Sequence, residues 1–277
     1  MYNQVDKYDL TNKVSLITGA AGLLGRQHSY ALAIKGSIVI MTDTNSDLLE
    51  KARDDIASIT SSDNIHSFIM DVTEENSVID IKKKLAEQSM IVSILVNNAA
   101  VDPKMKTFKD KGHGRLESFS IEEWNRQINV GLTGAFICSK IFGTEMAAQN
   151  NGVILNISSD LSIFSPDQRI YEQAGLNSDQ QPKKPVTYPV IKTGLIGLTR
   201  YLATYWADKN IRANALSPSG VYSGQNRVFV DKLQELIPLG RMANEDEYIE
   251  AVQFLCSDAS AYMNGQNIVM DGGRSIW

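Results

Sequence analysis

Short apolar runs alternate with amphipathic stretches along most of the chain. Runs rich in β-branched residues predict strands over Val14–Thr18, Ser37–Met41, Phe68–Met70, Ile91–Val96, Val153–Ile157, Ile211–Leu216 and Ile268–Met270. Apolar residues at helical spacing predict helices over Gly22–Ile34, Asp47–Ile59 and Glu74–Glu87, and near 131–149, 189–208 and 245–257. Because the strands are continuously apolar, helices should cover both faces of a parallel sheet. Right-handed crossovers then predict an α/β doubly wound sheet that binds ligands beyond the carboxyl ends of its strands.

Two polar segments interrupt this alternation, near 102–118 and 165–185. Each follows a predicted strand, so each should project from the ligand-binding edge of the sheet. The alternation of strand and helix resumes after both segments, which argues against a linker between domains. We therefore expect one domain over residues 1–277, with two insertions beside the site. Surface loops or contacts between subunits are the alternative roles for these insertions.

The composition indicates a globular protein and excludes several kinds of partner. Of the 277 residues, 43% are hydrophobic and 21% are charged, which suffices to form a core. With 27 Lys and Arg against 32 Asp and Glu, the net charge of −5 predicts no binding to nucleic acid or to anionic membranes. No apolar run is long enough to span a membrane, and the first residues lack the apolar core of a signal peptide.

The cysteines and histidines point to a reducing compartment and to chemistry without a metal. Cys138 and Cys256 lie far apart without CxxC spacing, so we expect buried thiols, no disulfide framework and a cytoplasmic location. His28, His66 and His113 form no pair with the spacing of metal ligands, so we expect no metal site.

A glycine-rich turn, Thr18–Gly25, joins the first predicted strand to the first helix. Gly19, Gly22 and Gly25 allow backbone N–H groups to approach a pyrophosphate at the positive end of the helix. An ordinary turn between strand and helix could carry the same glycines. Because the motif opens the first βα unit, as the fingerprint of a Rossmann fold requires, we favour dinucleotide binding.

An acidic residue, Asp43, follows the second predicted strand. At this place a carboxylate accepts a hydrogen bond from a ribose 2′-hydroxyl and repels a 2′-phosphate. The next residue is Thr44, whereas an arginine would be needed to compensate the repulsion. The sequence therefore favours NAD(H) over NADP(H), with a solvated charge at the start of a helix as the alternative.

Tyr188 and Lys192 lie four residues apart, and so on one face of a predicted helix. A free tyrosine has a pKa of about 10, and a nearby ammonium lowers this value because it stabilises the phenolate. The pair is therefore a candidate general acid and base. Tyr205 and Lys209 have the same spacing, but no serine or asparagine motif accompanies them. We interpret this second pair as a contact on the helix surface.

The order of the motifs resembles the classical short-chain dehydrogenase/reductase family over nearly the whole chain, from Lys13 to about Gly273. The matching pieces are the glycine-rich turn, Asp71-Val72, Asn97-Asn98-Ala99-Ala100, Asn129, Asn156-Ile157-Ser158-Ser159, Tyr188 with Lys192, Asn214–Pro218 and Met270-Asp271-Gly272-Gly273. The chain also looks like bacterial members associated with surface-glycan and flagellin sugar modification.

The resemblance implies a role for each matching residue. Tyr188 exchanges a proton with the substrate oxygen, Ser159 hydrogen-bonds that oxygen, and Lys192 holds the nicotinamide ribose. Asn129 supports a water relay to Lys192. The implied contacts to the cofactor NAD(H) are Gly19, Gly22, Leu24, Gly25, Asp43, Asp71, Val72, Asn98, Ala99, Tyr188, Lys192, Pro218 and Val221. The resemblance also implies a homotetramer or homodimer that associates through the helices near 131–149 and 189–208.

The sequence departs from the family pattern at several positions. Leu23 and Ser219 stand where the family has glycine, and the insertion near 165–185 separates Ser159 from Tyr188 by an unusual length of chain. The spacing of Gly19, Gly22 and Gly25 is typical of extended, nucleotide-sugar-type members. An epimerase or dehydratase that retains its NAD is therefore one alternative, and a catalytically silent NAD-binding scaffold is another.

The insertions also indicate the substrate. They are rich in Lys, Arg and side-chain amides, which suit a carboxylate or phosphate and many hydroxyl groups, whereas a steroid or an acyl chain needs an apolar lining. We therefore expect interconversion of a secondary alcohol and a ketone in a polar sugar or sugar-acid derivative. The candidate substrate contacts are Arg115, Gln168 and Arg169.

Overall fold

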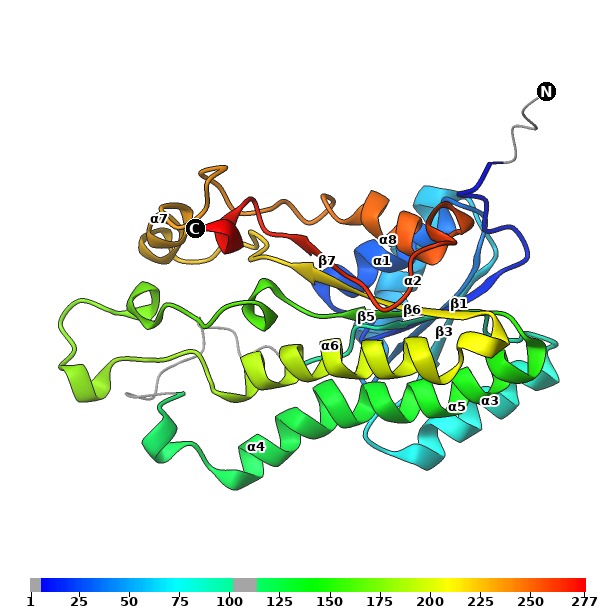
Figure 1. Cartoon of the computed structure of the whole chain (residues 1–277), viewed down its shortest axis with the longest axis horizontal. Coiled ribbons are helices and arrows are strands. Elements are labelled where there is room, and N and C mark those ends of the chain that lie inside the picture. Colours follow the sequence, from blue (N-terminus) through cyan, green and yellow to red (C-terminus); the bar gives the residue numbers. More distant parts are fainter. Residues whose placement is uncertain (1–5, 102–113) are drawn as a thin grey trace.

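The computed structural model describes residues 6–101 and 114–277, which form one seven-stranded sheet covered by helices (Figure 1). All strand pairs are parallel, in the order β3-β2-β1-β4-β5-β6-β7. The strands span Val14–Thr18 (β1), Ile38–Asp43 (β2), Ile65–Ile69 (β3), Ile94–Asn97 (β4), Gly152–Ile157 (β5), Ile211–Pro218 (β6) and Asn267–Met270 (β7). The strand order reverses between β1 and β4, and a doubly wound sheet opens its ligand crevice at that point. The predicted fold class is confirmed.

Helices cover both faces of the sheet. Figure 1 shows α1, α2 and α8 on one face and α3, α5 and α6 on the other, and each layer buries its own apolar cluster against the strands. The helices span Leu23–Ala33 (α1), Ser46–Thr60 (α2), Glu75–Glu87 (α3), Ile121–Ile128 (α4), Gly134–Gln149 (α5), Thr187–Tyr205 (α6), Arg227–Gln234 (α7) and Ile249–Cys256 (α8). A π-helical turn, Asn129–Thr133, joins α4 to α5. Among the described residues, no helix has the length and apolar character needed to cross a membrane.

Two strands lie at different places from those the sequence predicted. The third predicted strand, Phe68–Met70, is found at Ile65–Ile69, and its inner positions are half-buried because β3 is an edge strand. It therefore lacks the continuous apolar run of the central strands. The run Ile91–Val96 enters the sheet only at Ile94, since Ile91 is exposed in the preceding loop.

The sequence did not predict α4 and α7. Both are short, and their buried positions are few: Gln127 in α4, and Val230 and Leu233 in α7. Such narrow stripes give little helical periodicity. The helix expected near 189–208 already ends at Tyr205. Lys209, the second member of the other Tyr–Lys pair, therefore lies beyond the helix.

The second insertion packs against α7. Its Ile170 and Tyr171 form a small buried cluster with Val230 and Leu233, apart from the core of the sheet. Lys232 of α7 also donates from Nζ to two backbone carbonyls of the insertion, at 3.0 and 3.2 Å. The insertion is therefore held in place by a core of its own.

The first insertion meets the second at its end. Residues 102–113 lie outside the described part of the chain, but Arg115 donates from Nη1 to the Ser178 carbonyl at 2.9 Å. Gly114, at φ +76°, lies so close to the Lys183 carbonyl that a Cβ atom would collide with it. The ends of both insertions thus lie side by side.

Candidate active site

The glycine-rich turn follows β1 and lies against the end of β4. Gly19 adopts φ +63°, and a Cβ atom there would come within 2.8 Å of the Ala99 Cα. At Gly25 a Cβ atom would collide with the Gly19 carbonyl oxygen. Asn98 donates from Nδ2 to the carbonyls of Thr18 and Gly19, at 3.0 Å each. Asn98 therefore fixes the turn. Gly19 and Gly25 are required because a Cβ atom at either position would collide with the protein's own backbone.

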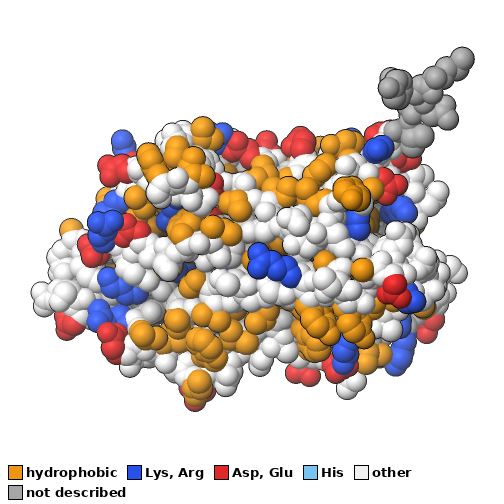
Figure 2. All heavy atoms as spheres, viewed as in Figure 1, with side chains coloured by type: hydrophobic (Ala, Val, Ile, Leu, Met, Phe, Trp, Pro, Cys, Tyr) orange, Lys and Arg blue, Asp and Glu red, His pale blue; other side chains and the backbone are white. Residues whose placement is uncertain are grey.

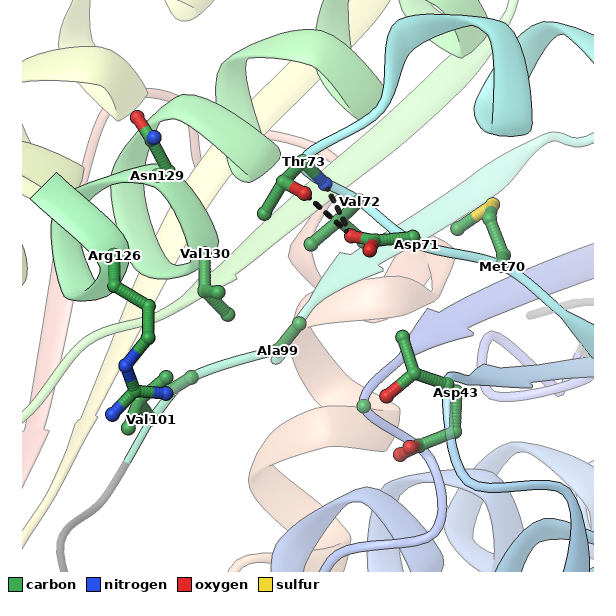
Figure 3. Close-up of a pocket in the computed structure, with 13 residues that line it drawn as sticks. Asp43, Met70, Asp71, Val72, Thr73, Ala99, Val101, Arg126, Asn129 and Val130 are labelled. Atoms are coloured by element: carbon green, nitrogen blue, oxygen red, sulfur yellow. Dashed lines mark hydrogen bonds between the residues drawn. The ribbon is translucent and has the colours of Figure 1, made fainter.

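A cleft of about 450 Å³ opens at the carboxyl ends of β1 to β4 (Figure 3). It brings together residues that are far apart in the sequence: Gly19, Asp43, Thr44, Met70, Asp71, Val72, Thr73, Ala99, Ala100, Val101, Arg126, Asn129 and Val130. The cleft lies at the edge that the doubly wound fold predicts for its ligand. Six residues expected from the sequence share its wall: Gly19, Asp43, Asp71, Val72, Ala99 and Asn129.

Asp43 lies at the end of β2 and connects two segments of the wall. Its Oδ2 accepts from the Ala21 N–H at 3.2 Å, and its Oδ1 accepts from the Asn45 N–H at 3.0 Å. The carboxylate is therefore held between the glycine-rich turn and the start of α2. Figure 3 shows Arg126 on the opposite side of the cleft, where Glu123 binds its guanidinium at 2.7 and 2.8 Å. These hydrogen bonds raise the pKa of Arg126.

Asp71 follows β3 and forms the middle of the wall. Its Oδ1 accepts from the backbone N–H and the hydroxyl of Thr73, at 2.9 and 2.7 Å, as the dashed lines of Figure 3 mark. Its own N–H donates to the Ser77 hydroxyl at 3.0 Å. Asp71 is thus held through its backbone N–H and through one carboxylate oxygen, and presents a fixed acceptor to a ligand.

Tyr188 and Lys192 lie in the first turns of α6, and Lys192 is fixed to the end of β5. Lys192 is 5% exposed, and its Nζ donates to the Ile157 carbonyl at 2.8 Å. Ser158 in turn donates its hydroxyl to the Lys192 carbonyl at 2.8 Å. The Lys192 ammonium lies 5.7 Å from the centre of the Tyr188 ring. Strand and helix thus hold the ammonium beside the phenol, as the spacing predicted.

A second lysine near the phenol was missed in the sequence. The Lys184 ammonium lies 3.8 Å from the centre of the Tyr188 ring, closer than Lys192. Gln168 holds the backbone of Lys184, because its Oε1 accepts from the Lys184 N–H at 2.9 Å. Lys184 lies before the start of α6, so helical spacing gave no signal for this contact.

Ser159 follows β5 and is the N-cap of a 3-10 turn, Asp160–Ser162. It donates its hydroxyl to Asp160 Oδ1 at 2.9 Å and accepts from the Leu161 N–H at 3.2 Å. The turn lies against α6, since Thr193 donates its hydroxyl to the Ser162 carbonyl at 3.4 Å. Ser159 and Tyr188 therefore belong to neighbouring elements despite the insertion between them.

Asn129 lies in the π-helical turn, at the wall of the cleft. Gly131 of the same turn is buried against α6, where a Cβ atom would come within 2.7 Å of Ile191 Cγ2. Because Ile191 adjoins Lys192, this close packing places the turn beside the Tyr–Lys pair. Single π-helical turns are frequent at functional sites.

Other candidates lie away from the cleft or serve the fold. Arg169 has 81% of its side chain exposed and pairs with Asp167 at 2.7 Å, which lowers the pKa of Asp167 to about 2. Leu24 and Val221 pack against the sheet core, and Pro218 ends β6. Arg115 binds the Ser178 carbonyl.

The thiols and the acidic groups give no sign of metal or cysteine chemistry within the described residues. Cys138 and Cys256 are buried as expected, and desolvation raises the pKa of each thiol to about 12. In residues 6–101 and 114–277, no group of three or more His, Cys, Asp and Glu side chains is placed to hold a metal ion.

Comparison with known proteins gives the family. The family model described as enoyl-(acyl carrier protein) reductase matches residues 19–275. The chain therefore belongs to the classical short-chain dehydrogenase/reductase family, a family of oxidoreductases that act on CH–OH groups. The family resemblance seen in the sequence is confirmed.

Three of the relatives have a substrate or a cofactor in their names. D-threitol dehydrogenase of Mycolicibacterium smegmatis is 30% identical over 278 residues, covering 97% of this chain and 95% of that protein. A short-chain dehydrogenase of Leptospira borgpetersenii with bound NAD+ has a TM-score of 0.83 and 28% identity, with 99% and 97% of the two chains covered. A gluconate 5-dehydrogenase of Burkholderia cenocepacia, in complex with NADP and tartrate, has a TM-score of 0.81 and 25% identity over 98% of each chain. The solved relatives thus differ in their cofactor.

Proposed function

We propose that the protein is an NAD(H)-dependent oxidoreductase that interconverts a secondary alcohol and a ketone in a polar sugar or sugar-acid derivative. The observation that carries this proposal is the Tyr188–Lys192 pair, fixed to the end of β5 at the edge of the sheet where the cleft opens. A binding module has no need for a buried ammonium beside a phenol.

The cleft suits a dinucleotide, because the glycine-rich turn reaches its wall at Gly19 and the acidic residues Asp43 and Asp71 are held in place there. Gly19, Gly22, Leu24 and Gly25 would hold the pyrophosphate. Asp43 would accept from the ribose hydroxyls, and Asp71 with Val72 would contact the adenine. Asn98, Ala99, Pro218 and Val221 would line the nicotinamide half. When bound, the nicotinamide supplies or accepts the hydride.

Four side chains would take part in proton transfer to and from the substrate. Tyr188 donates its phenolic proton to the substrate oxygen in reduction and accepts the proton in oxidation. The Lys192 ammonium favours the phenolate form that remains. Ser159 contacts the same oxygen, and Asn129 supports a water relay from Lys192 to solvent. The elements that hold these residues are rigid strand and helix ends, which suits a site that must fix its geometry.

The substrate class rests on polarity. D-threitol and gluconate, named for the relatives, are polyhydroxylated, and Arg115, Gln168 and Arg169 belong to the polar segments beside α6 and α7. These three residues remain the proposed substrate contacts. An association with surface-glycan or flagellin sugar modification agrees with this chemistry.

We also propose a homodimer or homotetramer in the cytoplasm. Large apolar side chains are exposed on the helices of one face: Phe136 of α5, and Val190, Tyr201 and Tyr205 of α6. Figure 2 shows hydrophobic side chains gathered over this lower part of the molecule. A second copy would bury them. Light scattering of the purified protein tests this, and a monomer at micromolar concentration would contradict it.

The substrate proposal is tested by the absorbance of NADH during turnover. The panel contains D-threitol, glycerol, gluconate and other sugar acids, with a β-hydroxyacyl thioester as the apolar control. We expect turnover of at least one polyol or sugar acid with NAD+, and little with the thioester. A clear preference for the thioester would contradict the sugar proposal while leaving the site intact.

A further inference from the structure

Gln127 of α4 carries a buried amide that makes hydrogen bonds on both sides. The residue is 2% exposed. Its Nε2 donates to Glu123 Oε1, one turn earlier in α4, at 2.5 Å, and its Oε1 accepts the hydroxyl of Thr187, the first residue of α6. Thr187 is fully buried and adjoins Tyr188 in the chain. A hydrogen bond between the two helices therefore ends one residue away from the candidate catalytic phenol.

The first turn of α6 lacks the usual support for the start of a helix. Within the described residues, no side chain caps its N-terminus, where Val186 has helical dihedral angles instead of the extended ones of a typical N-cap. Pro189, the third residue of the helix, has no backbone N–H. Helix ends fray, and Tyr188 lies in this turn. The contact of Thr187 with Gln127 takes the place of a cap.

The start of α4, by contrast, is well supported. Ser120 is its N-cap and accepts the Glu123 N–H at 3.1 Å. The Glu123 carboxylate binds the Arg126 guanidinium at 2.7 and 2.8 Å. A carboxylate only accepts hydrogen bonds, so it takes the NH2 group of the Gln127 amide, which turns the amide oxygen toward Thr187. The capped helix thus presents an oriented acceptor to the uncapped one.

We propose that Gln127 is a positioning residue for the catalytic tyrosine: it fixes Thr187, and with it the first turn of α6, so that Tyr188 is held at the reacting oxygen. The inference rests on the proposed function, in which Tyr188 exchanges the proton. A small displacement of a reacting group can lower the rate considerably. Lys192 is anchored separately, at the Ile157 carbonyl, so loss of the Gln127 contact should move the phenol relative to the ammonium.

The first test is a double-mutant cycle between Gln127 and Thr187. Thr187→Val removes the hydroxyl and Gln127→Met removes the amide, each with little change in volume. We expect each variant to lower kcat about tenfold, with KM and the Kd for NADH within about twofold of wild type. The double variant should lose about as much as either single variant, because both remove the same contact. Losses that multiply would indicate independent packing defects and would overturn the proposal.

Melting temperatures separate positioning from stability. Each single variant leaves one buried polar group without its partner, whereas the double variant replaces both by apolar groups and should recover the melting temperature. Turnover should stay low in the double variant, because an apolar contact does not fix the direction of the turn. Turnover that recovers together with the melting temperature would show a merely structural contact, and the proposal would be wrong.

The second test follows the phenol itself and needs no substrate. Subtracting the spectrum of the matching Tyr188→Phe protein isolates the phenolate absorbance of Tyr188 during a pH titration. Lys184 and Lys192 both face its ring, with their ammonium groups 3.8 and 5.7 Å from the ring centre. In Thr187→Val we expect a midpoint about half a pH unit higher, because the phenol is held less closely beside the Lys192 ammonium. An unchanged midpoint would contradict the proposal.

Two milder variants cover the case in which Thr187→Val fails to fold. Thr187→Ser keeps the hydroxyl and should keep kcat within about twofold of wild type. Glu123→Ala removes the carboxylate that orients the Gln127 amide, at a side chain that is already 34% exposed. It should lower kcat about threefold, and no further in the Gln127→Met background, because it acts through the amide. An equal loss in that background would contradict this route.

The matched control is Thr199→Val, the same substitution at another buried threonine of α6. Thr199 is 1% exposed, and its Oγ1 accepts Nδ2 of Asn156 at 2.8 Å. The control should lower the melting temperature and leave the Tyr188 titration unchanged. A shift as large as that of Thr187→Val would overturn the proposal. If the wild type oxidises no alcohol, the proposed function fails, and the titration still decides this inference.

Discussion

The two ends of α6 carry the same Tyr–Lys spacing and differ in everything else. At the first end, Lys192 is 5% exposed and donates to the end of β5, beside the Tyr188 ring. At the other end, Tyr205 is 60% exposed and stacks on Tyr201 at 5.5 Å between ring centres. The helix ends there, and Lys209 lies on a separate 3-10 turn, paired with Asp208 at 3.0 Å. A four-residue spacing places two side chains on one face only where the helix continues from one to the other. At the first end of α6 the helix does continue, and the end of β5 also holds the Lys192 ammonium.

The largest effect should come from the phenol. Tyr188→Phe removes only the hydroxyl that exchanges the proton, so we expect kcat to fall about 10²-fold or more while NADH binds as before. Steady-state kinetics and calorimetry on one preparation measure both quantities. Tyr205→Phe is the control at the other end of α6 and should keep full turnover. Equal rates for the two variants would remove Tyr188 from the mechanism.

Removal of the Lys192 ammonium, which lies beside the phenol, should lower kcat about tenfold or more. Lys192→Met keeps the length of the side chain but loses the charge and the hydrogen bond to the Ile157 carbonyl. Lys209→Met removes a surface ammonium at the same spacing from a tyrosine. It should change neither turnover nor the melting temperature, since exposed ion pairs contribute little. A Lys192→Met enzyme at the full wild-type rate would contradict the comparison.

Much of this contrast could be predicted from the sequence. The central strands are continuously apolar, and the motif order gave the two Tyr–Lys pairs their different interpretations. The edge strand Ile65–Ile69 was predicted with the wrong bounds, and the short helices α4 and α7 were not predicted, because each buries too few positions to show a clear period. The contact of Asp160 with Arg274 spans 114 positions, and no local spacing marks it. Only the fold brings the carboxyl ends of β5, β6 and β7 next to one another.

Cofactor choice should respond to Asp43. We expect wild-type protein to bind NADH more tightly than NADPH, because the carboxylate accepts from the ribose hydroxyl and repels a 2′-phosphate. Asp43→Ala should reduce this preference about tenfold. Asp47→Ala, an acidic residue of the first turn of α2, is the control and should leave the preference unchanged. Tighter binding of NADPH to the wild type by calorimetry would contradict the assignment.

The smallest effect belongs to the second lysine near the phenol. Lys184→Met removes a cation 3.8 Å from the Tyr188 ring centre, so we expect kcat/KM to fall about threefold. Lys183→Met, one residue earlier, is the matched control and should be silent. A Lys184→Met loss as large as that of Lys192→Met would mean that the roles of the two lysines need to be exchanged.

The central claim is that the residues at the carboxyl end of β5 and the start of α6 catalyse net hydride transfer between an alcohol and NAD(H). The most direct measurement mixes enzyme, NAD+ and the alcohol identified by the screen, and compares NADH formed with ketone formed. The account predicts one NADH for each ketone, over many turnovers, with both lost together in Tyr188→Phe. Product without net NADH would indicate an epimerase or dehydratase that retains its cofactor. Tight NAD+ binding without product from any alcohol tested would indicate a silent scaffold, and either result would contradict the account.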